Sequence, residues 1–451
     1  MSSGGRFTYD RAQLREFAAQ VLAAARKAGA TACECDVSEG YGLAVTVRKG
    51  ALDTLEHNRD KSIGVTIYLG SRPAARLGHA STSDFSPAAI VRTVEAAIAI
   101  ARHTAVDDCA GPPEPEFLAR ELPELDLYHP WAPSADEAIG IARRCEASAF
   151  ALSPRIRNSE GASVSAQQSQ FVFANSDGFM AGFPTSRHSL YVALIAEDAR
   201  GMQRDDWYSA ARASAGLADP EALGRYAGER TLARLGARRL STRRAPVLFE
   251  APQAAMLLGS FVSAASGGNL YRKSSFLADS LGKAVFSPGV TIEEKPRVPQ
   301  AFGSTPFDDE GVATRARTVV RGGVLEGYFL GSYSARKLGL ASTGNAGGSH
   351  NLFLAPDGPD FRGMLRRLDR GLLVTELLGH GVNLITGDYS RGAAGYWVEG
   401  GEIAYPVEEI TIAGNLKDMF RNVVASGSDI LVRGSRHCGS VLVDGMTIAG
   451  E

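Results

Sequence analysis

Glycine pairs in the second half of the sequence separate runs in which apolar and polar residues alternate. The clearest case is GYWVEGGEIAYPVEEITIAG, residues 395–414, where two such runs flank Gly400-Gly401. Alternation is typical of strands with one buried face, and glycine supplies the backbone angles of tight hairpin turns. Similar runs occur in VLFE, GVTIEE, TRARTVVRGGVLEGYFLG, GLLVTELLG, DILVRG and SVLVDGMTIAG. The pattern predicts a large, mostly antiparallel sheet.

One helix is predicted to interrupt these strands, from about Pro252 to Ala265. Its residues Met256, Leu257 and Phe261 follow an imperfect helical spacing. We expect this apolar stripe to pack against the sheet.

The first half mixes helices with strands. Asp10 and Gln13 have the spacing of a capping box, which predicts a helix from there to Gly29, and Ser86-Pro87 predicts the start of a second helix. Between them lie two strand-like runs, 43–47 and 63–69, joined by turn residues and a further short run. We interpret this region as an antiparallel meander rather than a βαβ unit.

A length of 451 residues exceeds what one hydrophobic core supports, so at least two domains are expected. The segment ARRLSTRRAP, residues 237–246, is charged and lacks apolar periodicity. We therefore predict an α+β fold with two domains. An N-terminal α+β domain with an antiparallel sheet spans residues 1–240, and a strand-rich C-terminal domain spans residues 241–451.

Composition excludes several classes of protein. The formal net charge is −2, without the basic excess that a nucleic-acid binder needs, so no nucleic-acid partner is expected. We expect no membrane partner either, because no apolar stretch approaches the length of a spanning helix. The N-terminus lacks the apolar core of a secretory signal, and five scattered cysteines do not form a disulfide framework. These features predict a cytoplasmic protein.

Two segments are candidates for binding or chemistry. The loop 342–350, which contains Asn345 and His350, has successive glycines whose backbone N–H groups could cradle a phosphate or carboxylate. The alternative is a loop that lets two strands approach closely. Cys438 is a candidate nucleophile, but its neighbour His437 would point to the opposite face of a strand, so a buried, inert thiol is favoured.

Metal sites are hard to find in this sequence. The eight histidines never fall at H-x3-H or H-E-x-x-H spacing, although a site assembled from distant residues stays open. The acidic runs 308–310 and 408–409 could bind a hard cation, but solvated turns are the better interpretation.

Several segments resemble one known family along nearly the whole chain. They are DKSIGVTIYLGSRPA, ASTSDFSPAAIVRTVEAAIAIAR, DDCAG, TPFDDEGVATRARTVVRGGVLEGYFLGSYSARKLG, STGNAGGSHNL and CGSVLVDGMTIAG. In this order they resemble the PmbA (TldE) type of the TldD/PmbA metalloprotease family, also described as modulators of DNA gyrase. In that family the TldD subunit carries zinc on an H-E-x-x-x-H motif, with a cysteine near the C-terminus as third ligand.

The resemblance implies that this chain lacks the zinc site. The motif positions fall on Gly259, Ser260 and Ala264, which have neither the zinc donors nor the carboxylate base, and Cys438 lies near the place of the third ligand. The implied function is that of a non-catalytic subunit, without catalytic or metal residues or a cofactor of its own. The zinc is expected on a TldD-type partner, and the heterodimer would degrade or process unfolded and precursor peptides. The chain alone is expected to be inactive and to form a homodimer. Two alternatives stay open: a stand-alone hydrolase using Cys438 or an assembled metal site, and a phosphate or small-molecule binder using the 342–350 loop.

Overall fold

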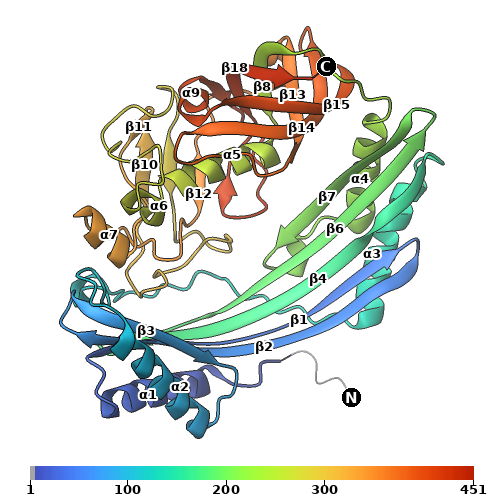
Figure 1. Ribbon diagram of the computed structural model, residues 1–451. Coiled ribbons are helices and arrows are strands. Elements are labelled where there is room, and N and C mark those ends of the chain that lie inside the picture. Colours follow the sequence, from blue (N-terminus) through green and yellow to red (C-terminus); the bar gives the residue numbers. More distant parts are fainter. Residues whose placement is uncertain (1–5, 451) are drawn as a thin grey trace.

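The structure, a computed structural model, describes residues 6–450, and their strands form one long curved sheet and two smaller sheets (Figure 1). The long sheet uses residues between 32 and 211, and the smaller sheets use residues between 243 and 449. Figure 1 shows the C-terminal half lying on the concave side of the long sheet. The predicted α+β class with mostly antiparallel sheets is confirmed, while the division near residue 240 stays a prediction.

The long sheet has the strand order β3-β2-β1-β4-β6-β7, with β5 beside β4, and all its pairs are antiparallel. Its strands are β1 (Ala32–Arg48), β2 (Ala51–Gly70), β3 (Ala75–Thr82), β4 (Ile156–Asn175), β5 (Met180–Ala181), β6 (Pro184–Asp198) and β7 (Gly201–Ala211). The meander is therefore confirmed, but the predicted runs are parts of longer strands. Residues 51–61, expected to hold turns, continue β2, because the chain already reverses at Lys49-Gly50, where both residues have positive φ (51° and 74°).

Four long helices of the first half cover one face of this sheet. They are α1 (Arg11–Lys27), α2 (Pro87–His103), α3 (Ala135–Phe150) and α4 (Pro220–Ala233). The capping box on α1 and the Ser86 cap on α2 are present as predicted. Cys33, Cys35 and Val37 of β1 pack under α1 and α2, so the residues between them, including Glu34 and Asp36, point to the opposite, concave face.

The two smaller sheets have the orders β15-β14-β13-β8-β18-β16 and β11-β10-β9-β12-β17. Two of their pairs, β8 with β13 and β12 with β17, are parallel, and the others are antiparallel. The strands are β8 (Arg243–Phe249), β9 (Ile292–Glu294), β10 (Arg317–Arg321), β11 (Val324–Leu325), β12 (Leu352–Leu354), β13 (Gly371–Leu378), β14 (Asp388–Glu399), β15 (Glu402–Asn415), β16 (Val423–Ser426), β17 (Arg436–His437) and β18 (Val441–Ala449).

One strand predicted in this half is wrong. Residues 429–434, DILVRG, pair with no strand among the described residues. The side chain of Arg433 reaches the first half instead and lies 3.7 Å from the ring of Trp207 and 4.2 Å from that of Tyr208. Contacts between a guanidinium and two aromatic rings thus replace sheet pairing here.

The predicted helix of the second half is present as α5 (Ala251–Ala264), and Leu257 and Phe261 are buried as expected. Met256 is 41% exposed, contrary to the prediction, because the buried stripe runs through Ala254, Leu257, Leu258 and Phe261 and leaves residue 256 outside it. The expectation of a single helix is also wrong. The others are α6 (Gly267–Tyr271), α7 (Ser332–Leu338), α8 (Phe361–Leu368) and α9 (Leu416–Arg421), which are too short to show a clear period.

Ion pairs join the two halves of the chain at both ends of the long sheet. Near β7 and α4, Arg230 binds Glu250 at 2.7 Å and Arg234 binds Glu376 at 2.5 Å. At the other end, Arg336 of α7 binds Glu114 at 2.7 Å. These contacts hold the loops of the second half over the concave face. Within residues 6–450 no helix has both the length and the apolar character that crossing a membrane requires.

Candidate functional site

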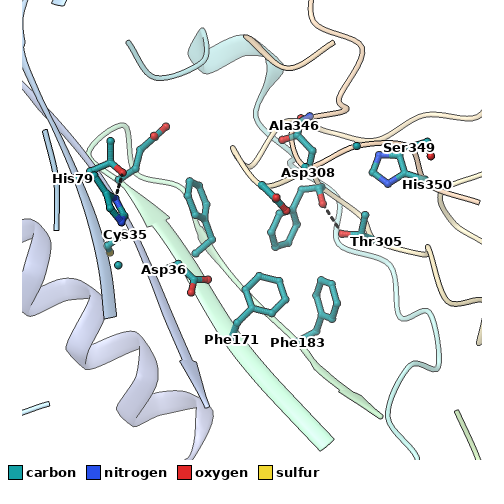
Figure 2. Close-up of a pocket in the computed structure, with 18 residues that line it drawn as sticks. Cys35, Asp36, His79, Phe171, Phe183, Thr305, Asp308, Ala346, Ser349 and His350 are labelled. Atoms are coloured by element: carbon teal, nitrogen blue, oxygen red, sulfur yellow. Dashed lines mark hydrogen bonds between the residues drawn. The ribbon is translucent and has the colours of Figure 1, made fainter. Parts of the chain in front are cut away.

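A pocket of about 580 Å³ lies between the concave face of the long sheet and two loops of the second half (Figure 2). Figure 2 shows Asp36 and His79 on the sheet side and Asp308 and His350 on the loop side. The lining residues are Glu34, Cys35, Asp36, Gly64, Thr66, His79, Phe171, Phe173, Phe183, Thr305, Phe307, Asp308, Asp309 and residues 346–350.

Strand register brings the sheet side of the pocket together. Asp36 on β1 pairs with Gly64 on β2 and with Phe173 on β4, so these residues share one face. Glu34 pairs with Thr66, which in turn pairs with His79 on β3. Glycine at position 64 keeps the sheet open beside Asp36, because it has no side chain above the strand.

Two buried carboxylates hold the glycine-rich loop that forms the other side. One oxygen of Glu294 accepts hydrogen bonds from the Asn345 side chain and from the His350 backbone N–H, both at 2.8 Å. Asp308 accepts the backbone N–H of Ala346 at 2.9 Å. The loop's N–H groups at 346 and 350 therefore donate to the protein's own carboxylates, which disfavours the anion cradle considered from the sequence.

The sequence-predicted residues of this loop are separated by the structure. His350 lines the pocket, and its ring Nε2 lies 2.7 Å from the Gly344 carbonyl oxygen. Asn345 lies beneath the loop, 4% exposed, where Thr343 and Arg317 also donate to its side-chain oxygen. Asn345 thus shapes the loop from below.

The pocket is acidic and partly dehydrated. Burial raises the pKa of Asp36 to about 6 and that of Glu34 and Asp308 to about 7. Burial also raises the pKa of Asp309. No lysine or arginine occurs among the described residues that line this pocket. A cluster of carboxylates without a facing lysine or arginine favours a positively charged ligand over an anion.

Sequence models of one family match most of the chain. They describe PmbA/TldA metallopeptidase domain 1 at residues 33–101, the central domain at 128–235 and the C-terminal domain at 242–450. The chain belongs to the PmbA/TldD metallopeptidase family.

Similar proteins cover nearly the full length of the chain. Metalloprotease PmbA of Escherichia coli O157:H7 is 50% identical over 95% of this chain and 94% of its own length. A Bacteroides thetaiotaomicron protein described as a modulator of DNA gyrase matches the structure with a TM-score of 0.91 at 25% identity, covering 99% of this chain and 100% of its own. TldE of Thermococcus kodakarensis shares the fold, with a TM-score of 0.84 at 20% identity over 96% of this chain and all of its own.

The three residues that the resemblance assigns to the zinc motif, Gly259, Ser260 and Ala264, carry none of the usual zinc donors. A Cβ atom on Gly259 would lie 2.9 Å from Nη1 of Arg436, so a guanidinium fills the space in front of the first motif position. Ala264 is fully buried in the core, and Ser260 keeps its hydroxyl within 3.5 Å of the Met256 carbonyl oxygen. Among residues 6–450 no three His, Cys, Asp or Glu side chains are grouped to hold a metal ion.

Cys438 is close to α5 but lies away from the pocket. It is 1% exposed, and its Sγ lies 3.8 Å from the Ala251 carbonyl oxygen. Burial raises the pKa of its thiol to about 12. The His437 ring stacks on Phe353 with 4.2 Å between centroids and forms no pair with the thiol. A buried, protonated thiol without a base is a poor nucleophile.

Thiol labelling checks this assignment of Cys438. Four cysteines are buried and Cys109 is partly exposed. With Ellman's reagent we expect about one fast-reacting thiol in the native protein and all five after denaturation. Cys109→Ser should remove the fast thiol, while Cys438→Ser should leave it unchanged. Loss of the fast thiol in Cys438→Ser would show that Cys438 is reactive.

Sequence reasoning missed Glu34, Asp36 and Glu294, which shape the pocket. Alternation in ACECDV does place Glu34 and Asp36 opposite the two cysteines, so their shared face was predictable. Their partners 305–309 and 346–350 follow about 270 and about 310 residues later, and no local pattern connects such distant segments.

Proposed function

We propose that this chain is the non-catalytic subunit of a cytosolic TldD/TldE-type zinc protease that degrades or processes unfolded and precursor peptides. The observation that carries this proposal is the guanidinium of Arg436 in front of Gly259, where the family motif has a zinc ligand. A positive charge and a missing donor at one position disfavour zinc binding there and support the proposal. The scaffold of a metallopeptidase without its metal ligands is best explained if a TldD-type partner supplies them.

A free sheet edge supports peptide or subunit binding. The strand β3 pairs with β2 from Ile63 onwards. Residues 51–60 of β2 are exposed and, among the described residues, pair on one side only, with β1. The unpaired edge of this strand offers main-chain donors and acceptors to another extended chain, largely independent of that chain's sequence.

Co-purification tests the proposal. The chain alone should show no peptidase activity and no stoichiometric zinc, and light scattering should find a homodimer. With a TldD-type partner it should form a 1:1 complex, with an interface on the order of 2,000 Å² or more, that cleaves an unfolded peptide. A stable monomer that ignores the partner, or one zinc per isolated chain, would contradict the proposal.

A matched pair of variants locates the chemistry. In this chain Ser260 stands where the family motif has its catalytic glutamate. We expect the complex with Ser260→Ala to keep full activity. Replacing the motif glutamate of the partner by glutamine should abolish activity, since only that carboxylate would act as general base. Equal loss in both variants would place chemistry in this chain.

A further inference from the structure

The carboxylate of Glu34 on β1 has one oxygen that nothing satisfies. Glu34 is 8% exposed and lines the pocket, and its Oε2 accepts a hydrogen bond from the Tyr68 hydroxyl at 2.8 Å. Its Oε1 is buried and has no hydrogen-bond partner among the described residues. An unsatisfied buried acceptor is costly, and a ligand that brings an N–H donor would remove the cost.

Phenylalanine rings form the wall beside the carboxylates. Phe171, Phe173, Phe183 and Phe307 line the pocket, and Phe171 packs edge-on against Phe183 with 4.9 Å between centroids. Phe307 joins the same group, at 5.8 Å from Phe183. Aromatic faces attract organic cations and pack well against alkyl chains. A hydrated metal ion gains little from such a wall.

Two arginines outside the lining of the pocket are paired with other carboxylates. Arg72, whose charge acts on Glu34, forms an ion pair with Asp177, and Arg336 pairs with Glu114. The carboxylates of Glu34, Asp36, Asp308 and Asp309 line the pocket, and no lysine or arginine occurs among its described lining residues.

We propose that this pocket binds a positively charged organic group of a peptide: a lysine or arginine side chain, or an amino terminus. Asp36 and Glu34 receive its N–H donors, and the phenylalanine wall packs against its carbon chain. The inference rests on the proposed function, because it adds a preference for cationic residues to an otherwise sequence-tolerant peptide subunit. The volume of about 580 Å³ accommodates a long side chain with adjoining backbone.

The affinity of the pocket for a cationic group should increase as pH rises. Because burial raises the pKa values of Asp36 and Glu34 to about 6 and 7, these groups gain negative charge as pH rises from about 5 to 8, and cation binding should strengthen. The other titratable or charged groups that face the two carboxylates are Tyr68, Arg72, His79, Asp177, Asp308, Asp309, Glu310 and His350.

Peptide titrations on the full chain, alone and in complex with a TldD-type partner, test the proposal. The probes are capped peptides of about ten residues, labelled at the C-terminus, with a central lysine, arginine or norleucine. A fourth probe carries norleucine and a free amino terminus. We expect at least one cationic probe to bind about tenfold more tightly than capped norleucine. Comparison of the capped lysine and arginine probes with the probe that has a free amino terminus shows whether the pocket binds a cationic side chain or an amino terminus.

Matched variants assign the preference to the pocket. Asp36→Asn and Glu34→Gln should reduce it to less than about threefold. Glu95→Gln, an exposed carboxylate on α2, on the opposite face of the long sheet and outside the pocket, should keep it. Equal binding of all probes, no binding in either preparation, or an unchanged preference in Asp36→Asn and Glu34→Gln would overturn the inference. Equal binding and cleavage of all probes by the complex would leave the proposed function standing.

Discussion

Replacing Glu294 by alanine is expected to lower the free energy of unfolding by about 3–5 kcal/mol and to disorder the glycine-rich loop. The Glu294 side chain is 1% exposed, and its Oε2 accepts a hydrogen bond from Nε of Arg317 at 2.7 Å. Its other oxygen accepts the two hydrogen bonds from Asn345 and His350. The alanine variant leaves a largely buried guanidinium without its carboxylate and two buried N–H groups without an acceptor. Removing one member of a buried pair costs far more than a surface pair contributes.

The neighbouring residue on β9 gives the control for Glu294. Glu293 also forms an ion pair, with Lys295 at 2.6 Å, but both side chains are more than 40% exposed. Glu293→Ala should change the free energy of unfolding by less than about 1 kcal/mol, because water screens the pair. Urea unfolding followed by circular dichroism measures both variants. Similar losses for Glu293→Ala and Glu294→Ala would contradict the assigned role of Glu294.

Local patterns in the sequence predicted the elements that depend on local physics. Asp10 and Gln13 satisfy the first N–H groups of α1 by themselves, so the start of this helix follows from four adjacent residues. Gly400-Gly401 closes the β14–β15 hairpin with positive φ at both residues. The length of β2 was underestimated because residues 51–60 are exposed on both faces, so they show no apolar alternation.

The site depended on contacts that sequence patterns do not contain. Glu294 belongs to GVTIEE, which was predicted as a strand, yet nothing distinguishes it from the exposed Glu293 beside it. The difference arises from Arg317 and Asn345, 23 and 51 residues later. Through the family resemblance, the sequence predicted that Gly259 stands where the motif has a histidine. The position of Arg436 in front of Gly259 could not be predicted, because β17 reaches α5 only in the folded chain.

Restoring the family's motif in this chain should destabilise it without creating a zinc site. In the triple variant Gly259→His, Ser260→Glu and Ala264→His, the imidazole at 264 enters a site with 0% exposure. Overpacking of this kind costs about 1–3 kcal/mol or more, before the cost of burying a polar ring. α5 is a continuous α-helix from Ala251 to Ala264. On such a helix, positions five residues apart point about 140° away from each other, so without a local bulge the two histidines would not converge on one ion. The guanidinium of Arg436 in front of residue 259 would also repel zinc.

Single changes separate these causes. Residue 260 is partly exposed, so Ser260→Glu should leave the melting temperature nearly unchanged. Residue 264 is buried, so Ala264→His should lower the melting temperature by several degrees. Gly259→His should lower the melting temperature, because the new side chain contacts the guanidinium of Arg436. Adding Arg436→Ala should recover part of this loss, because it removes the contacting group. Calorimetry and elemental analysis of each variant measure the two effects. About one zinc per chain in the triple variant would show that α5 and its surroundings can still assemble the family's metal site. The difference between this chain and a zinc-binding relative would then lie in the side chains alone, because the backbone would have the required geometry.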